Sequence, residues 1–259
     1  MGVINITPDS FSDGGECFPT ESALSRARSM LSQGADILDL GAESTRPGSR
    51  GVSTDEELSR LLPVLEGLVK EGAIISVDTR KPEVARQALS LGAHIINDIT
   101  GLRDQDMRRV VAEFGAAAVI LHMQGEPETM QREPKYKDVV GEIKAFFETQ
   151  LRLVEKDGVG EVILDPGIGF GKTVEHNLEI LRRFGEFRAL GKPLMLGASR
   201  KSFLGAITGA ESPRDRLEGT IVSTVFGILG GASILRVHDL REGVRTARVA
   251  EAILKGSGS

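Results

Sequence analysis

Residues 74–79 read Ile74-Ile-Ser-Val-Asp-Thr79, a short apolar run that ends in a carboxylate and a hydroxyl. Continuous runs of Val, Ile and Leu are typical of parallel strands that are buried on both faces. The same pattern recurs along the whole chain, and the eight expected strands lie near residues 3–6, 36–40, 74–78, 94–97, 117–121, 161–165, 193–197 and 233–237. Nearly all of these runs end in polar residues: Asn5, Asp39, Asp78, Asn97, Asp98, His122, Asp165, Ser199, Arg200, Lys201, Arg236 and His238.

Segments with helical periodicity separate the runs. Thr54-Asp-Glu-Glu57 has the pattern of a capping box, and Pro63 within the following segment predicts a kink or a late helix start. Five glycines stand between a helical segment and the next run, as helix stops should: Gly34, Gly72, Gly92, Gly115 and Gly191. Right-handed crossovers allow a barrel or an open doubly wound sheet. The count of eight favours closure, so we expect an α/β fold, a TIM (β/α)8 barrel in a single domain over residues 1–255, with a flexible tail at 256–259.

Composition excludes several classes of function. The 259 residues suit one barrel, and the net charge of −5 argues against a general nucleic-acid binder. No apolar stretch approaches the length of a membrane span. Met1 stands directly before the first run, which leaves no room for a signal peptide, and the single cysteine, Cys17, excludes an internal disulfide. We therefore expect a cytoplasmic protein with neither nucleic-acid nor membrane partners.

The polar strand ends matter because a barrel enzyme builds its active site at the carboxyl ends of its strands. Three connections on that face are long, namely 7–19, 41–53 and 123–138. Long loops are either functional lids or surface excursions. We expect the first two to close over the site after the first substrate binds, which would exclude water from the reaction.

The segment Asp165-Pro-Gly-Ile-Gly-Phe-Gly-Lys-Thr173 looks like a phosphate loop but matches neither known pattern. Pro166 stands where the Walker motif needs glycine, and Lys172 stands where the dinucleotide fingerprint needs it. The glycines instead suit a sharp turn that leaves Asp165 projecting inward. A simple tight turn and a ligand-binding loop both remain open.

Asp78, Asn97 and Asp165 end three different strands. Burying two carboxylates and an amide together is costly unless hydrogen-bond donors meet them. A flat heterocycle with an amino group and ring N–H groups would supply those donors. The alternative is pairing within the protein, with Arg80, Arg200 or Lys201.

Arg236 and His238 are two residues apart at the end of the last run, so strand alternation points them to the same side. A guanidinium beside an imidazole would hold a diphosphate well. The alternative is that Arg236 pairs at the rim with Asp239 or Glu242. Asn5 offers one neutral oxygen, which suits an Mg²⁺ ion that keeps waters and is bridged by substrate phosphates.

These residues lie within motifs that resemble those of a known family. Met1-Gly-Val-Ile-Asn-Ile-Thr-Pro-Asp-Ser-Phe-Ser-Asp-Gly-Gly15 and Asp39-Leu-Gly-Ala-Glu-Ser-Thr-Arg-Pro-Gly48 resemble the first and second signatures of the dihydropteroate synthases. Ser76-Val-Asp-Thr79, Ile96-Asn-Asp98, His122-Met-Gln-Gly125, Asp165–Lys172, Ser199-Arg-Lys-Ser202 and Arg236-Val-His-Asp239 continue the resemblance in order. It covers essentially the whole chain.

The resemblance implies a transferase of folate biosynthesis. In that reaction 6-hydroxymethyl-7,8-dihydropterin diphosphate loses diphosphate by a dissociative C–O cleavage. The amine of 4-aminobenzoate captures the pterin, which gives 7,8-dihydropteroate. The resemblance also implies Mg²⁺ as cofactor, a homodimer, and sensitivity of the family to sulfonamides.

The resemblance further assigns roles to residues by their matching positions. Those implied to hold the pterin are Asp78, Asn97, Asp165 and Lys201. Those implied around the diphosphate are Asn5 with the Mg²⁺ ion, Thr45, Arg236 and His238. Met123 and Val237 are implied to bind substrate as well. Those implied around aminobenzoate are Arg46, Pro47, Phe170 and Ser202. Asp13 is implied to shield the pterin cation, and we expect Asp13, Asp78, Lys201, Arg236 and His238 to carry catalysis.

Two other functions fit parts of the pattern. A pterin-binding methyltransferase, which passes a methyl group from methyltetrahydrofolate to a corrinoid, shares the barrel and the Asp/Asn floor. It needs neither a diphosphate clamp nor the Ser44-Thr-Arg-Pro-Gly48 loop, and both are present here. A non-catalytic pterin binder is the other alternative, against which the intact Asn5, Lys201, Arg236 and His238 speak.

Overall fold

The computed structural model describes residues 1–6, 19–43, 51–126 and 129–256. The strands are β1 (Gly2–Asn5), β2 (Leu38–Gly41), β3 (Ile75–Asp78), β4 (Ile95–Asp98), β5 (Ala117–Leu121), β6 (Val162–Asp165), β7 (Met195–Leu196) and β8 (Ile234–Leu235). The α-helices are α1 (Pro19–Ser32), α2 (Thr54–Lys70), α3 (Pro82–Ser90), α4 (Gln105–Phe114), α5 (Val139–Lys156), α6 (Val174–Arg182), α7 (Ser202–Thr208), α8 (Leu217–Leu229) and α9 (Leu240–Lys255). The described residues also form two 3-10 helices, η2 (Phe184–Leu190) and η3 (Pro213–Asp215).

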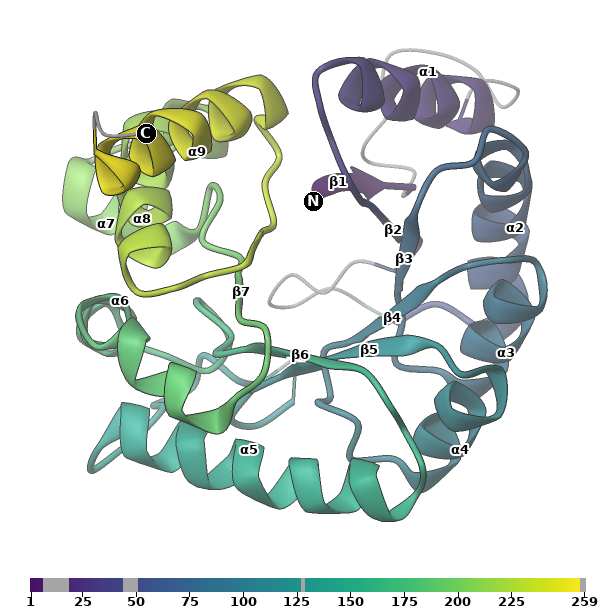
Figure 1. Cartoon of the computed structure of the whole chain (residues 1–259), viewed down its shortest axis with the longest axis horizontal. Helices are drawn as coiled ribbons and strands as arrows, with labels where there is room; N and C mark the ends of the chain where they lie inside the picture. The colour runs from purple at the N-terminus through teal and green to yellow at the C-terminus, as the bar shows by residue number, and fades with distance from the viewer. Residues whose placement is uncertain (7–18, 44–50, 127–128, 257–259) are drawn as a thin grey trace.

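The eight parallel strands form a closed ring with the helices outside it (Figure 1). β1 to β6 pair in chain order, and β7 pairs with β8. Two further contacts join these parts. The Leu164 amide donates to the Pro193 carbonyl at 2.9 Å, and the Val3 amide donates to the Val237 carbonyl at 3.0 Å. The predicted TIM barrel is therefore confirmed.

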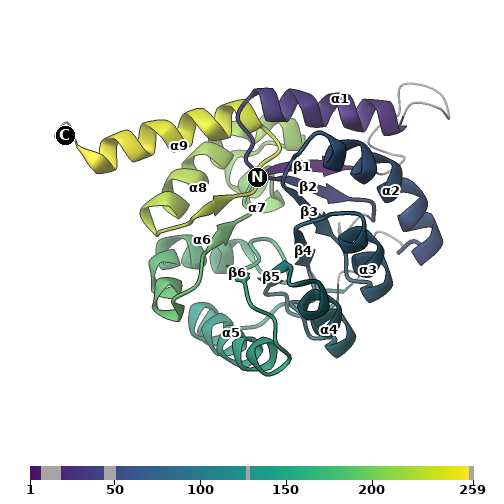
Figure 2. The same ribbon diagram turned by 45° about the vertical axis from the view of Figure 1, so that its right-hand side comes forward.

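The helix count departs from strict alternation. Between β7 and β8 the described chain forms both α7 and α8, which lie beside α9 at one side of the ring (Figures 1 and 2). The extra helix begins at Ser202, directly after the polar segment that ends β7, so it carries that segment onto the rim. Over the described ranges, no helix is both long and apolar enough to cross a bilayer.

The start of α2 differs by one residue from the expectation. Ser53, not Thr54, caps the helix, because the Ser53 hydroxyl accepts the Glu56 amide at 3.2 Å. Pro63 lies inside the continuous helix, so the alternative of a late helix start is wrong. All five predicted helix-stop glycines adopt positive φ, the conformation that favours glycine at such positions.

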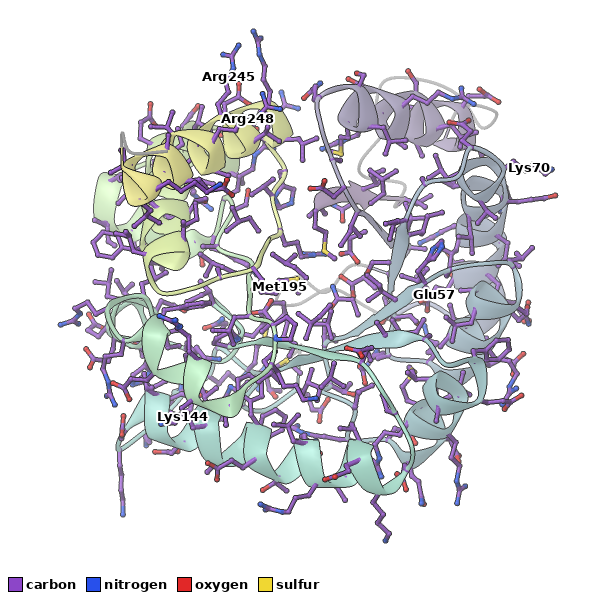
Figure 3. The ribbon with its side chains drawn as sticks, in the orientation of Figure 1. Glu57, Lys70, Lys144, Met195, Arg245 and Arg248 are labelled. Atoms are coloured by element: carbon purple, nitrogen blue, oxygen red, sulfur yellow. The ribbon has the colours of Figure 1, made fainter. Side chains whose placement is uncertain are left out.

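The interior of the ring is a packed core rather than a pore. Met195 lies near the middle of the ring (Figure 3), and it clusters with four other buried side chains, Met1, Ile95, Val119 and Ile163. The larger core fills the space between strands and helices. A filled barrel leaves only the two ends of the ring for chemistry, and the polar strand ends all lie at the carboxyl end.

Candidate active site

An arginine from the last strand crosses the carboxyl end of the barrel to reach two carboxylates. Arg236 donates from Nε to Asp39 Oδ2 at 2.7 Å and from Nη2 to Asp78 Oδ2 at 2.9 Å. The side chain of Asp39 is fully buried and that of Asp78 is 12% exposed. The three side chains come from β2, β3 and the residue after β8, so the barrel must close before they can meet.

Asp39 is the most heavily bonded carboxylate of the site. Besides Arg236, it accepts the Ser76 hydroxyl at 2.6 Å and, more weakly, the Asn97 amide nitrogen at 3.3 Å. Asn97 is buried, and its side-chain oxygen Oδ1 has no hydrogen-bond partner among the described atoms. An unpaired buried acceptor is uncommon and costly, so a donor from outside the chain would stabilise this site.

The pKa of Asp78 is raised to about 7, mainly by burial. The Arg236 cation lowers this pKa, and the neighbouring Asp39 carboxylate raises it. Asp78 therefore titrates in the neutral range while Arg236 stays a cation, whose pKa is raised by Asp39 and Asp78 despite its burial. Titratable groups with strongly shifted pKa values concentrate at functional sites.

Asp165 ends β6 on the same face. Its Oδ1 accepts the Gly167 amide at 2.8 Å, and burial raises its pKa while that bond and Lys201 oppose the rise. A Cβ at Gly197 would lie 3.4 Å from Asp165 Oδ2, so the absence of a side chain there leaves room around the carboxylate. Asp165 thus lies with one oxygen fixed by the turn that follows it.

Lys201 and Phe170 form the next part of the site. Lys201 Nζ lies 4.1 Å from the centroid of the Phe170 ring, a cation–π geometry. The pKa of Lys201 is lowered to about 8, mainly by burial and also by Arg236, while Asp165 and Asp78 act in the opposite direction. Met123 is buried beside Phe170 in a small apolar cluster. The site therefore combines a charged floor with an apolar aromatic wall.

His238 lies on the β7 side of the rim. Its backbone amide and its ring Nδ1 both lie 3.1 Å from the Ser199 hydroxyl. Burial lowers the pKa of His238 to about 3, with Arg236, Arg200 and Lys201 contributing in the same direction. The imidazole is therefore neutral at physiological pH, in surroundings positive enough to attract an anion.

The alternative pairings considered from sequence are mostly wrong. Arg236 does not pair with Asp239, because Asp239 is held by the guanidinium of Arg200. Arg80 pairs with Glu43 rather than with a floor residue. Lys201 lowers the pKa of Asp165, but the described residues show no ion pair between the two.

Other predicted residues lie apart from the floor. Asn5 ends β1 and is partly buried on the same rim. Val237 is buried in the main core toward Gly243 of α9, and its backbone completes the barrel next to β1. Ser202 is exposed at the first position of α7. Four predicted site residues lie outside the described ranges: Asp13, Thr45, Arg46 and Pro47.

The main residue missed from the candidate site is Asp39. It stands among the polar strand ends, yet the sequence analysis assigns no role to it. A signal is available, because Asp39 pairs in register with Ser76, two residues before Asp78, so the Asp39 and Asp78 side chains point to the same side of the sheet. What the sequence does not reveal is that Arg236 reaches it across the barrel.

Comparisons with known proteins agree with this geometry. Residues 1–238 match the family model described as "Pterin binding enzyme". The dihydropteroate synthase of Escherichia coli (strain K12) is 45% identical over 257 residues, which cover 98% of this chain and 91% of the relative.

Two solved structures illustrate the similarity. The dihydropteroate synthase of Thermus thermophilus in complex with 4-aminobenzoate superimposes with a TM-score of 0.89 at 50% identity, covering 98% of this chain and 93% of that one. The Yersinia pestis dihydropteroate synthase with a sulfonamide drug gives a TM-score of 0.94 at 40% identity, covering 99% and 94%. The chain therefore belongs to the family of pterin-binding enzymes, and within it to the dihydropteroate synthases.

Proposed function

We propose that this chain joins the methylene carbon of 6-hydroxymethyl-7,8-dihydropterin diphosphate to the amine of 4-aminobenzoate, releasing diphosphate and forming 7,8-dihydropteroate. The observation that carries the proposal is the charged floor, in which Arg236 links Asp39 and Asp78 beside Asn97 and Lys201. The methyltransferase alternative has no support among the relatives reported above, which are dihydropteroate synthases over nearly their whole length.

The floor suits a pterin because it is rich in acceptors. The unpartnered Asn97 Oδ1 and the carboxylate of Asp165 would accept hydrogen bonds from the amino and N–H groups of the heterocycle. Lys201, a donor, would face a ring acceptor. Asp78, with its pKa near 7, can accept as a carboxylate, and its negative charge would stabilise a cationic pterin.

The leaving diphosphate would lie toward His238 and Arg236. Arg236 keeps its positive charge, and the His238 imidazole can take up a proton when an anion arrives. Neutralising charge on the leaving oxygen favours C–O cleavage. A separate catalytic base is unnecessary, because the aromatic amine is already a nucleophile. These residues would therefore act by charge placement.

The Phe170 ring and Ser202 are proposed to border aminobenzoate. Phe170 offers an apolar face next to Lys201, and Ser202 offers a hydroxyl at the first turn of α7. An aromatic wall excludes water, which otherwise competes with the amine for the pterin cation.

Magnesium is proposed as the cofactor. The amide oxygen of Asn5 is a hard donor of the kind Mg²⁺ prefers, and the described residues contain no cluster of three or more His, Cys, Asp or Glu that could hold a metal. Asn5 would therefore hold the ion together with substrate phosphates and water. When bound, the ion would supply positive charge next to the leaving group.

A homodimer is proposed through the face formed by α7, α8 and α9. These helices lie together at one side of the ring (Figure 1), and α8 has a strongly apolar sequence. The exposed apolar side chains on them are Ile207, Val222, Phe226, Leu229, Val249, Ile253 and Leu254. Exposed apolar side chains gathered on neighbouring helices are typical of an interface between protein chains. Phe226→Glu should give a monomer by light scattering, whereas Phe114→Glu on the distant α4 should not. A wild-type monomer would contradict the proposal.

The activity is tested by mixing the purified chain with pterin diphosphate, aminobenzoate and Mg²⁺ and measuring diphosphate release and pteroate formation together. Lys201→Met should abolish most turnover, whereas Lys192→Met, the same change at an exposed position, should not. A folded chain that binds pterin without releasing diphosphate would be a non-catalytic binder. A cytoplasmic location, expected from the single cysteine, stays a prediction.

A further inference from the structure

Lys172 is a buried cation that the reaction outlined above does not use. It is 3% exposed, and within the described residues it forms no ion pair with a carboxylate. Its Nζ donates to the Phe170 carbonyl at 2.9 Å and to the His122 carbonyl at 3.2 Å, and lies 3.1 Å from His122 Nδ1. Three acceptors thus meet the three donors of the ammonium group.

The free energy needed to bury the Lys172 side chain indicates that the residue has a role in the site. Moving an ammonium group out of water is expensive, and burial lowers the pKa of Lys172 to about 7 with only Asp165 opposing. Burial lowers the pKa of His122 to about 2, followed by the effect of Lys172, so its Nδ1 remains an acceptor. A tight turn alone would not require a buried charge.

The segment that Lys172 ends is bound by side chains along its whole length. The Gly169 carbonyl accepts Gln131 Nε2 at 2.5 Å and the Gly171 carbonyl accepts the Tyr136 hydroxyl at 2.9 Å. The Gly169 amide donates to Asn177 Oδ1 at 2.8 Å. All three partners come from outside the turn, two from the connection before α5 and one from α6, so the segment is held by other parts of the chain.

The glycines bring this segment against the end of β5. Gly167 and Gly171 have φ of 71° and 60°. A Cβ at Gly167 would lie 1.9 Å from the His122 carbonyl oxygen, and one at Gly171 would lie 2.3 Å from the Gln124 carbonyl oxygen. Lys172 then ties the same His122 carbonyl to Phe170. The backbone of Phe170 is therefore fixed to the neighbouring strand end before any ligand arrives.

We propose that Lys172 is a positioning residue, which holds the Phe170 ring against Lys201 and so sets the affinity of the site for the aromatic amine half of its ligand. This rests on the proposed function for the identity of that ligand. Lys172 itself would contact no substrate, because its three donors are all used by the protein. Removing it frees the Phe170 carbonyl and lets the ring leave its position above Lys201 Nζ.

The test compares two ligands that share the pterin floor. Pteroic acid carries both the pterin and the aminobenzoate halves, whereas 6-hydroxymethylpterin carries only the first. By calorimetry, Lys172→Met should lower the affinity for pteroic acid roughly tenfold, the loss expected when an aromatic contact is displaced. The affinity for 6-hydroxymethylpterin should stay within about twofold of the wild-type value. Lys192→Met is the matched control and should bind both ligands as the wild type does.

Two further measurements keep the outcome clear. Tyr136→Phe removes only the hydroxyl that reaches the Gly171 carbonyl, so it should fold and show a smaller loss in the same direction. Hydrogen exchange should speed up in Lys172→Met at the Gly169 and Phe170 amides, which donate to Asn177 Oδ1 and to the Gly167 carbonyl. Equal weakening of both ligands, or unchanged pteroic acid affinity in folded Lys172→Met, would overturn the proposal. A wild type that binds neither ligand would instead refute the proposed function.

Discussion

Replacing Asp39 by asparagine tests whether the floor is held by the bonds described above. Asparagine has the same shape but carries no charge. Its amide oxygen can still face Arg236, and its NH2 group can donate to the Ser76 hydroxyl, which is able to turn and accept. The loss then falls on two contacts of Arg236 with Asp39 Oδ2. The hydrogen bond from Nε at 2.7 Å changes from charge-assisted to ordinary, and the ion-pair contact of Nη2 at 2.6 Å loses its charged partner.

The size of the effect follows from these contacts. A bond to a charged partner contributes about 1.5–3 kcal/mol and a neutral one about 0.5–1.5, so the hydrogen bond and the ion-pair contact, each reduced by a similar amount, together lose about 2–3 kcal/mol. Relief of the repulsion between Asp39 and Asp78 offsets part of this. We expect the free energy of unfolding to fall by about 2 kcal/mol at pH 8. This is less than the roughly 3–5 kcal/mol for a fully orphaned buried charge, because Arg236 keeps Asp78.

The effect should grow as the pH falls. In the wild type, the folded pKa of Asp78 is raised to about 7 from 3.8, so the folded protein binds a proton there before the unfolded chain does. Wild-type folding therefore gains stability between about pH 7 and pH 4 from this group. Without the Asp39 charge, Asp78 becomes the only carboxylate partner of Arg236, so its pKa falls and the gain shrinks, while burial still raises that pKa.

Urea unfolding at pH 8 and pH 5.5 measures both quantities. Asp39→Asn should lose about 2 kcal/mol at the higher pH and more at the lower one. The control is Asp36→Asn, the same change at an exposed position just before β2. A loss below about 1 kcal/mol at both pH values, or one that shrinks as the pH falls, would show that Arg236 does not depend on Asp39.

Three other outcomes are expected. Asp165→Ala should reduce pterin affinity by about 1–3 kcal/mol in calorimetry, since it removes a buried acceptor; wild-type affinity would mean that the pterin lies elsewhere. Mg²⁺ should bind negligibly without diphosphate, because Asn5 alone offers no charge, and tight binding to the protein alone would contradict this. The ring of His238, whose pKa is lowered to about 3 by burial and Arg236, should be neutral at pH 6. Diphosphate should raise that pKa and bind with proton uptake, measured in buffers of different ionisation enthalpy, and His238→Gln should lose the uptake.

Much of the fold follows from the sequence alone. Eight apolar runs separated by helical segments are enough to predict parallel strands and crossovers, because a strand that is buried on both faces is apolar at nearly every position. The polar residues at the ends of the runs, such as Asp78, Asn97 and Asp165, are visible for the same reason. A strand is local, and so is its hydrophobic pattern.

The partners within the site were decided by the tertiary structure. Arg236 lies 197 residues from Asp39, and nothing local distinguishes that carboxylate from the alternative partner Asp239, three residues away. Barrel closure brings β8 next to β1 and turns Arg236 toward the floor, while Arg200 takes Asp239. In the same way, the sequence shows Lys172 only as part of a segment that does not match a phosphate loop. The structure places the His122 carbonyl, directly after β5, beside its Nζ. The sequence determined which residues face the carboxyl end of the barrel. Only the closed ring determined which of them touch. Ion pairs and hydrogen bonds act over a few ångströms, and residues far apart in the sequence come within that distance only when the chain folds.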